Sequence, residues 1–363
     1  MASYLNPGPI FITGFPGFLS HQLLQRLVAS TDAPIHLLVL PHTLDDARQQ
    51  IADLDYRTPG TAERCQLHPG DITEPRLGLP DDTFDELTSS VATVWHLAAI
   101  YDLAVDEEIA YRVNVHGTIQ VLDFCEACDD LQKLNYVSTC YVAGKRSGQI
   151  LETELDRGQH HYNHYESTKF WAEVEVQRRR DDIPTTIFRP SIVVGDSQSG
   201  EIPKYDGPYY VFQLLHRLPE WLPIPKIGRG DTPANLVPVD FVTDAMVELG
   251  LREDTTDQVF HLADPMPMTS AEVVDQILDA LDRPPSMGRL PLNWVMRALE
   301  NESVEAWTGV PREALIYFHH EGRFDTTHTR EALADTSIMC PPLPIYLGTL
   351  LDFFLEHPDP SSL

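Results

Sequence analysis

A tyrosine and a lysine stand four residues apart in the stretch Tyr165-Glu-Ser-Thr-Lys169. On a helix this spacing places a phenol and an ammonium group on the same face. A neighbouring cation favours the phenolate, so such a pair can exchange a proton near neutral pH, and the ammonium could also hold the ribose hydroxyls of a nucleotide. The same pair occurs by chance on solvated helices, and alone it does not establish catalysis.

Two hydroxyl side chains, Ser138 and Thr139, follow directly on the apolar run that ends at Val137. That run reads as a strand, and α/β sheets bind their ligands at the carboxyl ends of the strands. A hydroxyl group at this position could hydrogen-bond a substrate oxygen shared with Tyr165. The two hydroxyls therefore favour the catalytic interpretation of the tyrosine.

Near the beginning of the chain, an apolar run ending at Ile12 leads into Thr13-Gly14-Phe15-Pro16-Gly17, and a helical apolar pattern follows over 18–28. This order predicts a strand, a tight turn and a helix, with free backbone N–H groups where a diphosphate could bind. Gly14 permits the turn, and Gly17 lets the backbone approach the phosphates. Ser20 stands where the usual fingerprint has a third glycine.

The elements that must position these residues alternate along the first 190 residues. Strands are predicted at about 9–12, 35–40, 65–69, 91–97, 134–138 and 185–189, and helices at about 18–28, 44–54, 106–128 and 162–180. This alternation predicts an α/β fold with a doubly wound parallel sheet. Later segments predict a strand at 258–262 and helices at 270–281 (with Ser270 as its N-cap), 293–300, 327–334 and 343–356.

The composition narrows the class of partner. The 363 residues include 55 acidic and 26 basic ones, which gives a net charge of −29. Nucleic acid is excluded as a partner because it requires a basic face, and an acidic membrane surface would repel this chain. We hypothesise that so acidic a surface suits a salt-rich cytoplasm, where salt screens the repulsion between its charges. A melting temperature that falls when KCl is added would contradict this hypothesis.

No secretory signal or membrane-spanning segment is recognisable, so a cytoplasmic enzyme is expected. The five cysteines are expected to be reduced thiols. Cys125 and Cys128 have CxxC spacing, but they lie in a helical pattern, where packing is favoured over metal binding. His160, His161 and His164 lack a completing carboxylate or thiol cluster, and no metal site is predicted.

Taken together, the chain resembles the extended short-chain dehydrogenase/reductase superfamily from about residue 9 to residue 262. The matching stretches are Thr13-Gly14-Phe-Pro-Gly17, Gly70-Asp71-Ile72, His96-Leu-Ala-Ala99, Asn114-Val-His-Gly117-Thr, Val137-Ser-Thr139, Tyr165-Glu-Ser-Thr-Lys169 and Arg189-Pro190-Ser-Ile-Val-Val-Gly195. Within the superfamily it looks most like the fatty acyl-CoA reductases and carrier-protein thioester reductases. That likeness rests on Phe188-Arg-Pro-Ser-Ile-Val-Val-Gly195, on Asp206-Gly-Pro-Tyr-Tyr210 and on the tail 324–343.

The resemblance implies a Rossmann-type sheet that binds NAD(P) over residues 1–200, joined by the strand at 258–262. A smaller, mostly helical substrate-binding lobe would comprise 201–257 and 263–363. The resemblance also implies hydride transfer to a carbonyl. Tyr165 would be the general acid, and Lys169 would tune it and hold the ribose. Thr139 would polarise the carbonyl, with Ser138 as the alternative, and Asn114 would hold the helix and a relay water.

The remaining site residues follow from the same resemblance. The cofactor would contact Thr13, Gly14, Phe15, Pro16, Gly17, Phe18, Leu19, Asp71, Ile72, Ala98, Ala99, Tyr165, Lys169, Pro190 and Ile192, and the substrate Ser138, Tyr141, Tyr209 and Tyr210. The branch usually carries an arginine after the second strand to bind the 2′-phosphate of NADP, whereas this chain has Leu40-Pro41-His42. Arg48 could reach that phosphate or only form a salt bridge, so NADP is favoured and NAD stays open.

The leading hypothesis is therefore an NAD(P)H-dependent reductase of an acyl thioester, such as acyl-CoA, or of an aldehyde. The apolar, aromatic stretch 205–222 favours a lipid-like substrate. One alternative is a sterol or nucleotide-sugar dehydrogenase or epimerase, and another is a non-catalytic NADP-sensing protein, because a fold alone does not establish catalysis. A homodimer through the helices at 106–128 and 162–180 is implied by the resemblance.

Overall fold

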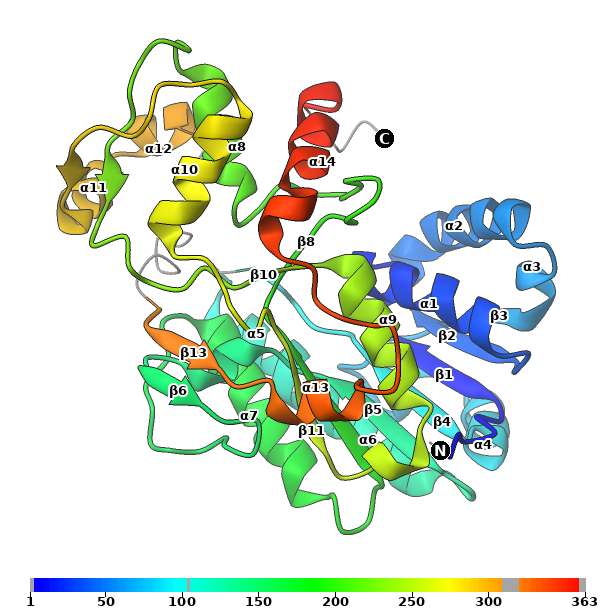
Figure 1. The fold of residues 1–363 in the computed structure, drawn as a ribbon. Helices are drawn as coiled ribbons and strands as arrows, with labels where there is room; N and C mark the ends of the chain where they lie inside the picture. Colours follow the sequence, from blue (N-terminus) through cyan, green and yellow to red (C-terminus); the bar gives the residue numbers. More distant parts are fainter. Residues whose placement is uncertain (1–2, 103–104, 309–319, 359–363) are drawn as a thin grey trace.

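The computed structural model describes residues 3–102, 105–308 and 320–358. Seven parallel strands form one sheet, in the order β11-β7-β5-β4-β1-β2-β3 (Figure 1). Their bounds are β1 Ile10–Thr13, β2 Ile35–Val39, β3 Cys65–Pro69, β4 Thr93–His96, β5 Lys133–Val137, β7 Thr185–Pro190 and β11 Val259–Leu262. The predicted doubly wound sheet is confirmed, including the late strand β11, which pairs in parallel with β7. The strand order reverses between β1 and β4, where such sheets leave a crevice for a ligand.

Helices cover both faces of the sheet. On one face, α1 (Phe18–Ser30), α2 (Leu44–Arg57) and α9 (Val239–Gly250) share an apolar core with β1 and β2. On the other, α4 (Asp81–Ser90), α6 (Gly117–Ala127) and α7 (His164–Arg178) pack on the opposite side chains of the strands. The short helix α3 (Thr61–Arg64) leads into β3. The strands thus bury side chains on both faces of the sheet, which lies at the centre of the molecule.

Helix α9 belongs to the sheet although it lies within the stretch 201–257 expected for the lobe. It packs beside α1, and its Phe241, Val242 and Met246 are buried in the core that α1 forms with the sheet. A Cβ atom on Gly250 would lie 2.2 Å from the Trp95 ring, so only glycine allows this close approach. The chain thus returns from the lobe to the sheet and then leaves it again.

The lobe has its own apolar core. Helices α8 (Tyr209–Arg217), α10 (Ser270–Ala280) and α14 (Leu343–Glu356) bury aromatic and aliphatic side chains against one another. Two further helices, α11 (Leu292–Ala298) and α12 (Glu302–Thr308), form a smaller cluster with the ribbon β9–β12 (Lys226–Ile227 and Arg289–Leu290). Helix α10 is capped by Thr269, whose hydroxyl accepts from the Glu272 N–H in a capping box. The prediction of Ser270 as the cap was therefore wrong by one residue.

Two short strand pairs and one helix connect the lobe to the sheet. β8 (Ile192–Val194) pairs with β10 (Leu236–Pro238), and β6 (Gly148–Ile150) pairs with β13 (Gly322–Phe324). Helix α13 (Thr327–Ala332) then lies along β11 (Figure 1). The chain after β13 therefore contacts the edge of the sheet before α14 returns it to the lobe.

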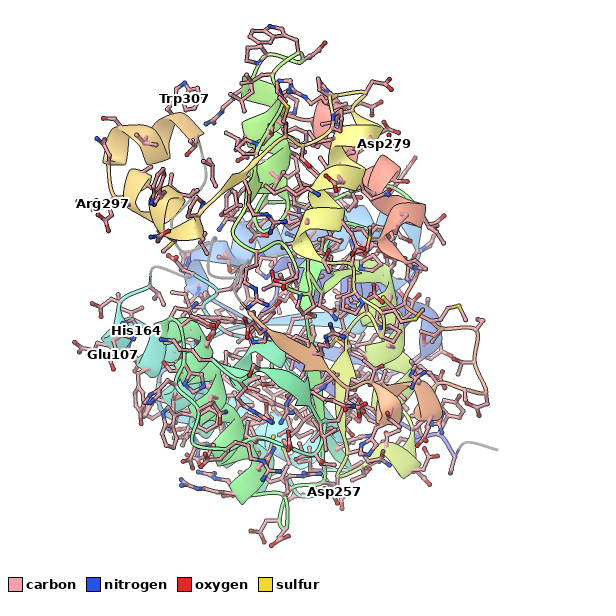
Figure 2. The ribbon with its side chains drawn as sticks, turned by 60° about the vertical axis from the view of Figure 1, so that its left-hand side comes forward. Glu107, His164, Asp257, Asp279, Arg297 and Trp307 are labelled. Atoms are coloured by element: carbon pink, nitrogen blue, oxygen red, sulfur yellow. The ribbon has the colours of Figure 1, made fainter. Side chains whose placement is uncertain are left out.

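Figure 2 shows how the two parts are oriented. Asp257, two residues before β11, lies at the end of the molecule far from the lobe, whereas Trp307 and Arg297 lie on the lobe itself. Glu107 and His164, which begin α5 (Glu107–Ala110) and α7, lie side by side between these extremes. The carboxyl ends of the parallel strands consequently face the lobe.

One helical prediction needs refinement. The helix expected over 106–128 is a continuous helical stretch, but its middle, η3 (Tyr111–His116), is a π-helix between α5 and α6. Helices α4, α8, α9 and α12 were not predicted. Within the described ranges, no helix combines the length and the apolar character that crossing a membrane requires.

Candidate active site

The glycine turn after β1 has the shape that a dinucleotide requires. Gly14 has φ +91°, and a Cβ atom on it would lie 2.7 Å from the Ala98 backbone nitrogen. A Cβ atom on Gly17 would lie 2.8 Å from the Gly14 carbonyl oxygen. Gly17 is the N-cap of α1 and has no side-chain cap, so the first N–H groups of this helix stay available for a ligand. The turn therefore fits a bound diphosphate.

Ser20, in the place of the third glycine, makes hydrogen bonds that a glycine could not make. Its hydroxyl lies 2.8 Å from the carbonyl oxygens of both Gly14 and Gly17, and its side chain is buried. These bonds fasten the first turn of α1 to the preceding loop. The departure from the fingerprint thus holds the turn closed. Phe15 is buried in the sheet core, and Phe18 packs against the core of the lobe.

A chain of neutral polar groups connects this turn to the opposite face of the sheet. The Ala98 N–H donates to the Thr13 hydroxyl (3.2 Å), which lies 2.7 Å from His96 Nδ1. His96 Nε2 lies 3.0 Å from the Thr118 hydroxyl, which donates to the Asn114 carbonyl oxygen (2.6 Å). Since the Thr118 proton is used there, His96 must donate from Nε2 and accept at Nδ1. Burial lowers the pKa of His96 to about 3, which keeps the ring neutral.

Asn114 lies in the π-helix η3, an irregularity that is frequent at functional sites. Its side-chain amide donates to the Thr168 hydroxyl (3.0 Å) and to the Ile100 carbonyl oxygen (3.3 Å), and its oxygen accepts from the Ile100 N–H (2.8 Å). Thr168 directly precedes Lys169. Asn114 thus fixes both the loop after β4 and the helix that carries the tyrosine–lysine pair. We call Thr13, His96, Thr118, Asn114 and Thr168 the neutral cluster.

The structure brings Tyr165 and Thr139 together. Thr139 follows β5 and its hydroxyl hydrogen-bonds the Tyr165 phenol. The Tyr101 ring, which was not predicted as a site residue, packs edge-on against the Tyr165 ring with centroids 5.0 Å apart. Burial raises the pKa of Tyr165, and the hydrogen bond with Thr139 partly opposes this. At neutral pH the phenol is therefore protonated, as a proton donor must be.

Lys169 lies one helical turn further on and is buried. Its ammonium donates to the Val137 carbonyl oxygen (2.8 Å) and to the Tyr136 hydroxyl (3.2 Å), and it sits 4.7 Å from the centre of the Tyr136 ring. Burial lowers the pKa of Lys169 to about 8, against the opposing effect of Glu173. Lys169 thus stays mostly cationic at neutral pH and lies at the carboxyl end of β5.

The Ser138 side chain hydrogen-bonds Glu173 and not Tyr165. Its hydroxyl donates to Glu173 Oε2 (2.6 Å), and Glu173 forms an ion pair of 2.5 Å with Arg189. Arg189 also donates to His261 Nε2 (3.1 Å) and to the Glu152 carbonyl oxygen (3.2 Å). The Glu152 carboxylate in turn accepts from the Thr329 hydroxyl (2.7 Å) at the first turns of α13. Of the two predicted hydroxyls, Thr139 is the one beside Tyr165. We call Ser138, Glu173, Arg189, His261 and Glu152 the ionic cluster.

The predicted substrate residues occupy different places. Tyr209 is fully buried in the lobe core, where its hydroxyl accepts from the Gly195 N–H (3.1 Å). Tyr141 is buried beside Thr139, whose hydroxyl oxygen accepts from the Tyr141 N–H (3.3 Å). Tyr210 is half-buried at the start of α8, near Asp206, and burial raises the pKa of the Asp206 carboxyl to about 6. Tyr210 and Tyr141 thus remain candidates, whereas Tyr209 is part of the lobe core.

The other predicted cofactor residues lie around the same edge of the sheet. The Asp71 carboxylate accepts from the Thr73 N–H (2.8 Å), and buried Ile72 packs against Gly117. Pro190 ends β7 and its carbonyl oxygen accepts from the Thr139 hydroxyl (3.4 Å). Arg48 is exposed on α2 and pairs with Asp45 (2.9 Å). The remaining predicted residues, Pro16, Leu19, Ala98, Ala99 and Ile192, are half-buried or exposed.

Sequence reasoning missed several residues of this site. His96 and Thr118 lie in the quoted motifs, but their hydrogen bonds depend on the order of the strands. Glu173 stands four residues after Lys169 on α7, a spacing that could have indicated it. No metal site is evident: the described residues contain no group of three metal-ligating side chains. Cys125 is buried in the core on one face of α6, and Cys128 is its C-cap.

Comparisons with known proteins agree with this geometry. Residues 12–246 match the protein family described as Male sterility protein. Over 330 residues the chain is 30% identical to Glycine betaine reductase ATRR of Emericella nidulans, covering 85% of this chain and 24% of that protein. Over 285 residues it is 26% identical to Fatty acyl-CoA reductase wat of Drosophila melanogaster, covering 68% of this chain and 54% of that protein. The chain therefore spans a quarter to about half the length of these relatives.

Among solved structures, the terminal R domain from the myxalamid PKS-NRPS biosynthetic pathway superposes with a TM-score of 0.82 at 26% identity. The match covers 96% of this chain and 91% of that domain. The similarity thus extends through the lobe as well as the sheet, beyond the residues that the family match covers.

Proposed function

The chain belongs to the Male sterility protein family of the extended short-chain dehydrogenase/reductase superfamily, and from this premise we propose that it is an NAD(P)H-dependent reductase of an acyl thioester or an aldehyde. The observation that carries the proposal is the hydrogen bond between Tyr165 and Thr139 at the carboxyl end of β5, with the glycine turn after β1, which is separated from β5 by β4 alone. The nicotinamide dinucleotide would be held by Gly14, Gly17 and the N-terminus of α1, and it supplies the hydride.

In this proposal the protein's own residues polarise the carbonyl and move one proton. Thr139 and Tyr165 hydrogen-bond the substrate oxygen from one side, and Tyr165 gives that oxygen its proton as negative charge develops there. Lys169 stays cationic and stabilises the resulting phenolate. Asn114 fixes the helix next to Lys169 and the loop of Ile100. From a thioester the product is a hemithioacetal, which releases thiol and leaves an aldehyde for a second reduction.

The choice between NADP and NAD rests on Arg48 and on the preference for NADP that the resemblance to this branch implies. Arg48 forms an exposed pair with Asp45, and a pair of this kind contributes little, so the guanidinium can exchange Asp45 for a 2′-phosphate at small cost. We therefore propose NADPH as the preferred reductant. We also propose that the acyl group of the substrate is lipid-like. The protein is further proposed to form a homodimer through α6 and α7, which gel filtration tests.

The test is to measure NADPH and NADH oxidation with purified protein, against a long-chain acyl-CoA and the matching aldehyde. Tyr165→Phe should reduce kcat by about 10²–10⁴-fold, the usual contribution of a positioned acid. Thr139→Val should lower kcat by about 10²–10³-fold. Ser138→Ala is the matched control, because its hydroxyl bonds Glu173, and it should change kcat by less than about threefold.

The outcomes distinguish the alternatives. Oxidation with acyl-CoA identifies a thioester reductase, and oxidation with aldehyde alone identifies a carbonyl reductase. Full turnover in Tyr165→Phe would refute the catalytic assignment. Binding of NADPH without turnover of either substrate would favour a sterol or nucleotide-sugar substrate, or a sensing role.

A further inference from the structure

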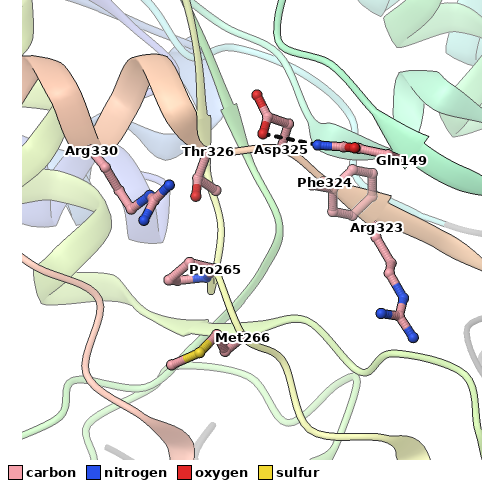
Figure 3. Close-up of a pocket in the computed structure, with 8 residues that line it drawn as sticks. All are labelled: Gln149, Pro265, Met266, Arg323, Phe324, Asp325, Thr326 and Arg330. Carbon is pink, nitrogen blue, oxygen red and sulfur yellow. Dashed lines mark hydrogen bonds between the residues drawn. The ribbon is translucent and has the colours of Figure 1, made fainter.

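A pocket of about 280 Å³ lies beyond the carboxyl end of β11 (Figure 3). Ligands of open α/β sheets bind at this edge. The pocket is formed by β6, by the loop after β11 and by the segment from β13 into α13. Its lining residues are Gln149, Pro265, Met266, Arg323, Phe324, Asp325, Thr326 and Arg330.

Two of these side chains are arginines on different walls of the pocket (Figure 3). Arg323 comes from β13 and Arg330 from α13, and both are exposed. In a chain with 55 acidic and 26 basic residues, neither guanidinium forms an ion pair or a side-chain hydrogen bond within the described ranges. Planar guanidinium groups around a cavity suit the paired oxygens of a phosphate.

The carboxylate of Asp325 also lines the pocket. One of its oxygens already accepts from the Gln149 side-chain amide (3.3 Å) and from the Thr327 hydroxyl (2.9 Å). These donors offset part of its charge and leave the two arginines as the dominant charges at the pocket. An anion is therefore the ligand that the charges favour.

The pocket adjoins the candidate active site through one pair of rings. Phe324 lines the pocket and packs edge-on against Tyr141 with centroids 5.6 Å apart. The Tyr141 N–H donates to the hydroxyl oxygen of Thr139, which contacts Tyr165. A substrate with its reacting carbonyl beside Thr139 would thus place a more distant part near the arginines.

We propose that Arg323 and Arg330 bind a phosphate group of the pantetheine carrier that presents the acyl thioester. The inference rests on the proposed reductase function and adds a recognition site for the part of the substrate that does not react. The chemistry is shared by free acyl-CoA and by the phosphopantetheine arm of a carrier protein. A site of this kind lowers KM for phosphate-bearing substrates and leaves the chemical step unchanged.

The test compares the full chain with Arg323→Gln/Arg330→Gln on three substrates with one acyl chain. These are the acyl-CoA, the acyl N-acetylcysteamine thioester, which has no phosphate, and the aldehyde. The double variant should raise KM for acyl-CoA by about tenfold or more through the loss of two charge-assisted contacts, with kcat within about twofold. KM for the other two substrates should stay the same. Arg178→Gln, which removes one exposed arginine at the far end of α7, is the control for the loss of a surface charge and should change none of these values.

Repeating the comparison with an acyl carrier protein separates the two sources of the phosphate. A rise in KM with acyl-CoA, with the carrier protein, or with both supports the pocket and identifies its ligand. An equal rise with the N-acetylcysteamine thioester, or no rise with either phosphate-bearing substrate, overturns it.

Failure of the proposed function has a different signature. If the unaltered protein reduces no thioester, calorimetric titration with CoA and with pantetheine still tests the pocket. CoA should then bind more tightly than pantetheine to the unaltered protein, and the double variant should lose that difference. Equal binding of the two ligands to the unaltered protein refutes the pocket.

Discussion

The tyrosine–lysine pair is held between two buried polar clusters of opposite character. The neutral cluster, from Thr13 to Thr168, connects β1, β4 and η3 through hydroxyl, imidazole and amide groups. The ionic cluster connects β5, α7 and β7 through Glu173 and Arg189, whose side chains are at most 1% exposed. The first supports the cofactor turn and the second the edge of the sheet that faces α13.

The two clusters differ in how much stability the fold loses when one partner of a contact is removed. A buried ion pair stabilises the fold only while both charges are present, because one charge left alone in the interior is very unfavourable. When one partner of a neutral hydrogen bond is removed, the other polar group stays buried without a partner. This costs less free energy of unfolding than a buried charge left alone. The ionic cluster should therefore control folding, and the neutral cluster should mainly control the position of the site.

The largest effect is expected when one side of the ion pair is removed. Arg189→Met leaves the Glu173 carboxylate buried without a cation and should lower the free energy of unfolding by about 3–5 kcal/mol. Urea denaturation followed by circular dichroism measures this loss.

Two controls accompany this variant. Arg189→Met combined with Glu173→Gln removes both charges and should recover part of the stability. Arg178→Gln breaks an exposed pair with Glu175 and should cost under about 1 kcal/mol. Equal losses for Arg189→Met and Arg178→Gln would contradict the special role of the ionic cluster.

A smaller loss is expected in the neutral cluster. Thr118→Val removes the hydroxyl that accepts from His96 and donates to the Asn114 carbonyl oxygen, with little change in shape. The free energy of unfolding should fall by about 1–3 kcal/mol, the cost of an unsatisfied buried group. The same urea experiment measures it, and a loss as large as that of Arg189→Met would remove the distinction between the clusters.

The smallest effect is a pH dependence of the reaction. Because burial lowers the pKa of Lys169 to about 8, the ammonium is protonated below that pH and loses its charge above it. Tyr165, whose pKa is raised, stays protonated throughout. The kcat/KM for aldehyde reduction should be constant at lower pH and fall about tenfold per pH unit above the break.

A pH profile measured at constant ionic strength tests this expectation. A constant kcat/KM across the break would show that the charge on Lys169 is not required. A decrease toward low pH instead would assign the break to an acidic group such as Asp206, whose pKa is raised to about 6.

Much of the sheet could be predicted because local patterns determine it. The strand predicted at 65–69 coincides with β3, and the helix predicted at 343–356 coincides with α14. Helix α4 was missed because Asp81, Asp82, Asp85 and Glu86 obscure its few apolar positions. Helix α9 was missed because it follows a stretch rich in proline and glycine.

Only the site residues that lie in local sequence motifs could be predicted. Tyr165 and Thr139 were named from their motifs, and the structure places them in contact. The choice of Thr139 over Ser138 depends on Glu173, Arg189 and Glu152, which come from three distant segments. Such a network is set by strand order, and no local spacing encodes it. The pocket of Arg323 and Arg330 forms only when β13 returns to β6.

Ser20 gives the cofactor turn a property that a third glycine would not provide. Glycine leaves a loop with the most conformational freedom of any residue, and ordering that loop around a ligand costs entropy. Here one hydroxyl fastens two carbonyl groups of the loop before any ligand arrives. The turn is therefore preorganised, and more of the interaction energy with the proposed diphosphate would be expressed as affinity.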